Sequence, residues 1–140
     1  KDCAVIFPEG SRASAKKRVR AIERLRERSP QRAEVLSGLQ YLIPPKPAGA
    51  SALLSAVPEA NVLVMWHSGF DGLDTFSGIL SHLGRAKAKV HVHVEEISRA
   101  LIPSGEAFVS WLDAKWVEMD NAVRRQLDSD ANGNRGVVHG

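Results

Sequence analysis

Three short apolar runs along the chain predict β-strands. Residues 3–7 predict a buried strand, and residues 61–66 predict a strand that is buried on both faces. Residues 89–94 alternate strictly, so three valines share one face of the strand, and His91 and His93 share the other. A proline and a glycine directly after the first run end it in a turn. We therefore expect a sheet of at least three strands.

Five stretches alternate with these runs and have the pattern of helices. Ser14 is a suitable N-cap for the first of them, and Pro30 fits the first turn of the second. The third is small and apolar, so it is expected to be buried. The last presents one apolar stripe, made of Phe108, Trp111, Leu112, Trp116, Met119 and Val123. The expected helices cover residues 14–28, 30–39, 49–57, 74–83 and 105–127.

The segments between these elements have the composition of connections. Three prolines exclude a helix over residues 43–47, and two glycines make residues 67–74 a loop. Residues 128–140 are polar and rich in Gly and Asn, so we expect a flexible tail. Strands that alternate with helices indicate an α/β fold, a layered sheet flanked by helices, which we place at residues 1–127.

Composition fits one folded domain with 140 residues, of which 44% are hydrophobic. A single cysteine, Cys3, excludes a disulfide framework and a cysteine-rich zinc site, and at the start of a buried strand it should be inert. No apolar run is long enough to span a bilayer. Because the chain begins at Lys1 and no signal peptide precedes the first apolar run, we expect it to be the later part of a longer protein.

Positive charge is concentrated in one segment, residues 12–32. Nine Lys and Arg stand there against two Glu, a balance of +7, whereas the whole chain carries +3. A basic block in an otherwise mildly acidic chain suggests an anionic partner, and phosphate-bearing ligands, anionic lipids and nucleic acids all qualify. A solvated helix face without a partner would have the same composition. We expect the helix over residues 14–28 to lie against anionic lipid.

The sequence Phe-Pro-Glu-Gly-Ser-Arg at residues 7–12 is the sharpest chemical feature. It lies at the carboxyl end of a predicted strand, where α/β proteins usually place ligands. Glu9 and Arg12 come close together on this turn, and the Arg12 guanidinium offers a planar fork of donors that suits phosphate. An ion pair between Glu9 and Arg12 that holds a loop is the alternative interpretation.

The same six residues resemble the phosphate-binding block of the glycerolipid acyltransferases, the lysophosphatidate acyltransferase family. Lys46 to Gly49 resembles the lysine-containing segment that precedes the family's next helix, and residues 56–66 resemble its last block, without the usual proline in the strand. The helix with Trp111 and Trp116 is similar to the C-terminal helix of a bacterial branch. The resemblance covers residues 3–127, and the long basic segment between Arg12 and Lys46 departs from the family pattern.

The resemblance implies an acyltransferase of phospholipid biosynthesis, membrane-associated at the cytoplasmic face and peripheral in this segment. Such enzymes move a fatty acyl group from acyl-CoA or acyl carrier protein to the hydroxyl of a lysophospholipid such as 1-acyl-glycerol-3-phosphate. No cofactor is implied beyond this co-substrate. The residues that would bind the acceptor phosphate are Glu9, Gly10, Ser11, Arg12 and Lys46. Lys46 is equally well explained as a solvated lysine of the linker.

The family's catalytic pair, His-x-x-x-x-Asp, is absent from this chain. His67 precedes Asp71 by one residue too few, and His91 has Glu96 at the right spacing, but the acid is wrong and the histidine lies within a strand. General base catalysis on the acceptor hydroxyl needs such a histidine. We therefore expect the pair to lie N-terminal to Lys1 and residues 1–140 alone to be inactive.

The other candidate functional residues have weaker support in the sequence. His91 and His93 stand two apart on one strand face, as metal ligands do, but no third ligand is evident. His67, Asp71 and Asp74 have no activated nucleophile beside them. The tryptophans of the last helix are core residues or lipid-interface anchors rather than a stacking platform for bases. The alternative function is a non-catalytic basic module that binds anionic lipid or nucleic acid, although no nucleic-acid motif is present.

Overall fold

The computed structural model describes residues 3–10, 13–69 and 90–135. This part of the chain forms four α-helices and a two-stranded antiparallel sheet. The helices are α1 (Ala15–Arg28), α2 (Pro30–Leu36), α3 (Pro47–Ala56) and α5 (Glu106–Arg135), and the strands are β1 (Val62–Ser68) and β2 (His91–Ile97). A short 3₁₀ turn, Arg99–Leu101, precedes α5. The expected mixed α/β class is confirmed at this level.

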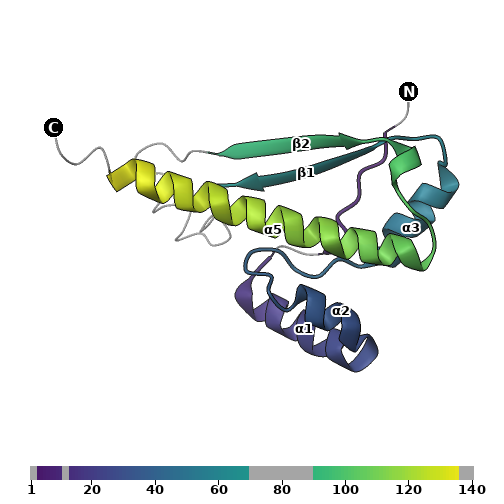
Figure 1. Ribbon diagram of the computed structural model, residues 1–140, viewed down its shortest axis with the longest axis horizontal. Coiled ribbons are helices and arrows are strands. Elements are labelled where there is room, and N and C mark those ends of the chain that lie inside the picture. The colour runs from purple at the N-terminus through teal and green to yellow at the C-terminus, as the bar shows by residue number, and fades with distance from the viewer. Residues whose placement is uncertain (1–2, 11–12, 70–89, 136–140) are drawn as a thin grey trace.

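The long helix α5 is the central element of the fold. Figure 1 shows the sheet along one side of α5 and the pair α1 and α2 along the other, with α3 near the beginning of α5. The apolar stripe of α5 faces this core as its spacing predicts. The buried side chains that form the core cluster come from every layer: Ile22, Leu36, Leu39, Ala50, Ile97, Ile102, Phe108, Leu112, Trp116 and Met119.

The sheet buries only one of its faces. In the antiparallel register Met65 lies opposite Val94 and Trp66 opposite His93. Val62, Val64 and Trp66 are partly buried against the core, whereas Leu63 and Met65 are 62% and 61% exposed. The prediction that this strand is buried on both faces is therefore wrong, because α5 covers one face and no described element covers the other.

Residues 3–7 do not form the predicted buried strand. Val5 is 74% exposed and Phe7 is 81% exposed, and Cys3 is a free, exposed cysteine. A strand needs a neighbour to accept its ladder hydrogen bonds, and within the described residues β1 and β2 pair only with each other. The segment runs from the sheet towards α5 as an irregular trace, coloured purple in Figure 1.

The first helix agrees with the prediction, and the later ones differ at their ends, since the second was expected to reach residue 39. The Ser14 hydroxyl accepts a hydrogen bond from the backbone N–H of Lys17 at 3.3 Å, which confirms the N-cap of α1. Helix α2 begins at Pro30 and ends at Leu36, and α3 buries only Ala50, so the expectation of a buried helix there is wrong.

The last helix is longer than the sequence pattern indicates. Its apolar stripe ends at Val123, but α5 continues to Arg135, so the predicted tail over 128–140 begins too early. Helix propensity does not require burial, and the polar residues beyond 127 extend the helix as a solvated end. The helix predicted over residues 74–83 lies outside the described residues.

Candidate phosphate-binding turn

Residues 7–10 form a tight turn whose sequence explains its geometry. The backbone N–H of Gly10 donates to the carbonyl of Phe7 at 2.9 Å, so Pro8 and Glu9 are the two central residues. Proline is favoured at the first central position of such turns and glycine at the last. Gly10 has φ +70°, a left-handed conformation that favours glycine over residues with a Cβ.

Lys46 lies against this turn, although 36 residues separate it from Gly10. Its backbone N–H donates to the carbonyl of Pro8 at 2.9 Å. Its side-chain Nζ lies 3.2 Å from the point that a Cβ on Gly10 would occupy. The absence of that Cβ therefore lets the ammonium group come close to the turn. Lys46 also precedes the first turn of α3, where backbone N–H groups face outwards.

Trp116 of α5 holds the turn and the connector together. Its indole N–H donates to the Glu9 carboxylate at 3.2 Å and to the carbonyl of Ile43 at 3.0 Å. The ring itself is buried in the core. A buried tryptophan needs a partner for its N–H, and here the partners are the two segments that meet at Lys46. The described contacts of Glu9 therefore anchor the turn to α5.

The environment of Glu9 disfavours its charged form. Burial raises the pKa of this carboxyl above its ordinary value of 4.5, the nearby Asp120 adds to the rise, and hydrogen bonds from Trp116 and at Ile43 oppose it. The folded protein therefore holds the proton of Glu9 more tightly than the unfolded chain does.

The contribution of Glu9 to the free energy of unfolding is expected to decrease as the pH rises. A raised pKa in the folded state gives a contribution that is complete below about pH 4.5 and is lost as the pH rises through the raised value. The Glu9→Gln variant keeps an oxygen acceptor for Trp116 but does not titrate. Urea denaturation over a pH series should show the native protein losing stability relative to Glu9→Gln as the pH rises. A difference between the native protein and Glu9→Gln that stays constant with pH would contradict the assignment.

Two buried carboxylates of α5 fix the connector that carries Lys46. Asp120 accepts hydrogen bonds from three consecutive backbone N–H groups, those of Gln40, Tyr41 and Leu42, at 2.7–2.9 Å. Asp113 binds Arg32 through both oxygens at 2.7 Å, and the same guanidinium donates to the carbonyl of Pro45 at 3.0 Å. The position of Lys46 is thus determined from both ends of residues 40–45.

The structure brings together three of the five residues predicted for the phosphate site. Glu9, Gly10 and Lys46 meet at the turn, while Ser11 and Arg12 lie outside the described residues. The predicted proximity of Glu9 and Arg12 therefore lies outside the described residues and stays a prediction. The partner that the structure gives Glu9 is Trp116.

Sequence reasoning missed the residues that hold this site in place: Arg32, Asp113 and Asp120. A weak signal was present, because both aspartates directly follow core positions of the last helix, Leu112 and Met119. It does not reveal their partners, because a buried carboxylate meets its hydrogen-bond donors only where the fold brings them.

The two histidines of β2 each contact another side chain of the protein. His93 stacks on Trp66 with ring centroids 3.9 Å apart, and Nε2 of His91 lies 3.3 Å from a carboxylate oxygen of Asp130. The described residues contain no group of three or more His, Cys, Asp or Glu that could hold a metal ion. The stacked pair instead borders a cavity of about 290 Å³ between the sheet and α5.

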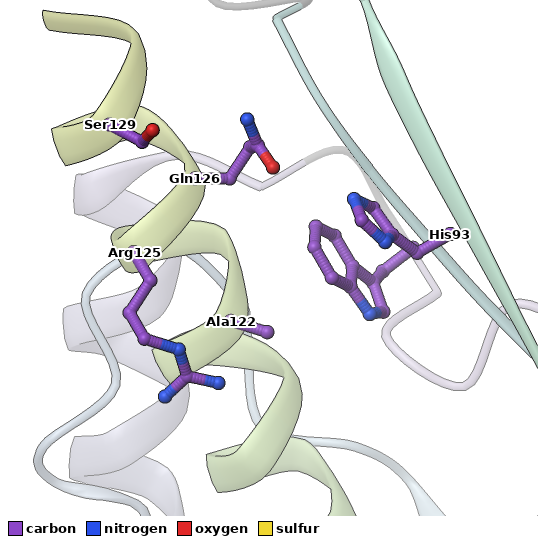
Figure 2. A pocket seen from close by; sticks show the side chains of 6 residues that line it. His93, Ala122, Arg125, Gln126 and Ser129 are labelled. Atoms are coloured by element: carbon purple, nitrogen blue, oxygen red, sulfur yellow. The ribbon is translucent and has the colours of Figure 1, made fainter.

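This cavity belongs to a different part of the molecule from the turn. Its other lining residues are Ala122, Arg125, Gln126 and Ser129, all from the second half of α5. Figure 2 shows Gln126 extending from the helix towards His93. Of the residues predicted for the phosphate site, the three that the structure describes, Glu9, Gly10 and Lys46, do not line the cavity.

Comparisons with models of protein families, with curated proteins and with solved structures give no match to this chain. Among the residues that the structure describes, no helix is long and apolar enough to cross a membrane.

Proposed function

We propose that this chain supplies the acceptor-phosphate site of a lysophospholipid acyltransferase. The observation that carries the proposal is the contact between Lys46 and the turn at Gly10. The sequence predicts the same role for both segments, and the fold brings them together although they lie 36 positions apart. The alternative interpretation, a solvated lysine of the linker, does not require Lys46 to lie beside the turn.

The chemistry of the contact suits a phosphate monoester. The Lys46 ammonium supplies a positive charge, and no described residue forms an ion pair with it. The backbone N–H groups at the start of α3 add the positive end of a helix dipole beside it. In the proposed site, Ser11 and Arg12, which follow Gly10 directly in the sequence, would add a hydroxyl and a second cation.

The proposed reaction places an acyl group from acyl-CoA or acyl carrier protein on the free hydroxyl of the bound lysophospholipid. The chain's own residues hold the phosphate end of the acceptor and need no cofactor for that task. A base must still take the hydroxyl proton, and none of the five histidines has an aspartate at the family spacing. Binding of the phosphate group is therefore the activity to measure in this chain.

Replacing Lys46 by alanine should weaken the binding of sn-glycerol 3-phosphate about tenfold or more. A hydrogen bond to a charged group contributes about 1.5–3 kcal/mol, and the exposed position of Lys46 favours the lower end of that range. Isothermal titration calorimetry of residues 1–140 measures the dissociation constant. Lys46→Arg keeps the charge and should retain part of the affinity.

Arg124→Ala is the matched control, because it removes one positive charge from an exposed position of α5 away from the turn. Its affinity for glycerol 3-phosphate should equal that of the native chain. Gly10→Ala gives a second test, since the added methyl group would stand 3.2 Å from Nζ of Lys46 and at a positive φ. Equal losses in Lys46→Ala and Arg124→Ala would reject a site at the turn and favour the alternative function of a general basic module.

A further inference from the structure

Four cations form a ladder along one side of α1. Lys16, Arg20, Arg24 and Arg28 follow one another at intervals of four residues, and all four are exposed. Residues four apart on a helix are neighbours on its surface, so the ladder is a continuous row. At 1.5 Å of rise per residue it extends over about 18 Å. The buried and half-buried side chains of α1, Ile22 among them, lie on another side of the helix and pack towards α2.

The ladder has no direct ion-pair partner within the described part of the chain. No described residue forms a hydrogen bond or an ion pair with any of the four side chains. Glu23 and Glu27 stand on the same helix, yet neither is paired with a ladder cation. Like charges four residues apart on a helix repel one another, and Glu23 and Glu27 offset only part of this repulsion. An anionic partner would remove this repulsion.

We infer that the Lys16–Arg20–Arg24–Arg28 ladder docks α1 on the surface of an anionic lipid bilayer. A row of long, flexible basic side chains on a helix that packs on α2 by another side can reach a plane of negative charge. Each Lys or Arg near such a surface contributes about 1 kcal/mol to binding. The neighbouring Val19 is 57% exposed, so an apolar side chain accompanies the cations at the same helix.

Nucleic acid fits α1 less well. The helix, AKKRVRAIERLRER, contains no aromatic residue on which a base could stack. It also contains no Asn, Gln, Ser or Thr, which would be needed besides Arg and Lys to read the range of base edges. The ladder offers only Arg and Lys, which suit phosphates and guanine edges, whereas a bilayer presents phosphates and carboxylates in a plane. Nucleic acid is therefore the competing outcome of the test.

The position of α1 also relates this docking to the phosphate site. This part of the argument rests on the proposed function. The helix begins five residues after Gly10, and five residues of chain span at most about 18 Å. A bilayer bound by the ladder would therefore lie near the turn that is proposed to hold the phosphate of a lipid. The charge argument for the ladder does not depend on this relation.

The test compares two double variants of residues 1–140 that lose the same charge. Arg20→Gln with Arg24→Gln neutralises the centre of the ladder, and Arg124→Gln with Arg125→Gln neutralises two exposed cations of α5. Glutamine has nearly the helix propensity of arginine, so both helices remain. Co-sedimentation with vesicles of phosphatidylcholine and phosphatidylserine should show a partition coefficient about 30-fold lower for the ladder variant, about fivefold for each cation.

Four further arms separate the outcomes. Binding should vanish on pure phosphatidylcholine and should weaken when the ionic strength rises from about 0.1 M to about 1 M, which shortens the Debye length from about 10 Å to about 3 Å. Equal losses in both double variants, or binding that ignores lipid charge, would overturn the proposal. Tighter binding to a DNA duplex than to vesicles at the same salt, lost in the ladder variant, would overturn it in favour of nucleic acid. Lys46→Ala should leave vesicle binding nearly intact, so failure of the phosphate site and failure of the ladder are distinguishable.

Discussion

Replacing Asp120 by alanine is expected to lower the free energy of unfolding by about 3–5 kcal/mol. The Asp120 carboxylate is 4% exposed and accepts three hydrogen bonds, from the backbone N–H groups of residues 40–42. Each buried donor left without a partner costs about 1–3 kcal/mol, and the three hydrogen bonds to Asp120 are partly buried. The loss is a large share of the roughly 5–15 kcal/mol that stabilises a typical domain. Urea denaturation followed by circular dichroism measures it.

Asp128→Ala is the control for this variant. It removes the same side chain from an exposed position of the same helix, so it should change the stability by less than about 0.5 kcal/mol. Asp120→Asn keeps one acceptor oxygen and should fall between the two. Because residues 40–45 lead to Lys46, Asp120→Ala should also weaken the binding of glycerol 3-phosphate. A variant as stable as Asp128→Ala would show that Asp120 does not hold the connector.

Replacing Asp113 by alanine should lower the free energy of unfolding by about 3 kcal/mol. The Asp113 side chain is 4% exposed and makes two hydrogen bonds of 2.7 Å to the Arg32 guanidinium, whose side chain is 19% exposed. Removing one partner of a buried ion pair costs about 3–5 kcal/mol, because the other charge stays buried without compensation. The partial exposure of Arg32 places the expected value at the lower end. Urea denaturation again measures the change.

A double-mutant cycle tests whether the cost comes from the unpaired charge. Asp113→Leu combined with Arg32→Met removes both charges, and apolar residues of similar volume often replace a buried ion pair at little cost. The double variant should therefore be more stable than either single variant. Single losses that simply add would contradict a direct coupling between Arg32 and Asp113.

The sequence alone determined the local elements whose signals are short-range. Ser14 caps α1, Pro30 begins α2, and the Phe7–Gly10 turn has the proline and glycine that its geometry needs. The apolar stripe of α5 also lies where its periodicity predicts. Each of these features depends on residues within a few positions of one another, so a pattern in the chain is enough to find it.

Only the tertiary structure decided which segments meet. An apolar run such as residues 3–7 becomes a strand when another strand offers its backbone groups, and none of the described elements does so. The sheet face with Leu63 and Met65 is exposed for the same reason, since burial depends on a covering layer rather than on the run itself. Apolar composition by itself therefore predicted burial where the described fold provides none.

The same distinction between local signals and tertiary contacts holds for the candidate site. The sequence pointed to Gly10 and Lys46 separately, because a glycine after Pro-Glu and a lysine before a helix are local signals. Their contact depends on Trp116, Asp120 and the Arg32–Asp113 pair, which bind the turn and the connector to one face of α5. Hydrogen bonds between residues about 80 to 107 positions apart leave no periodic trace in a chain, because their geometry exists only after α5 has packed against both segments.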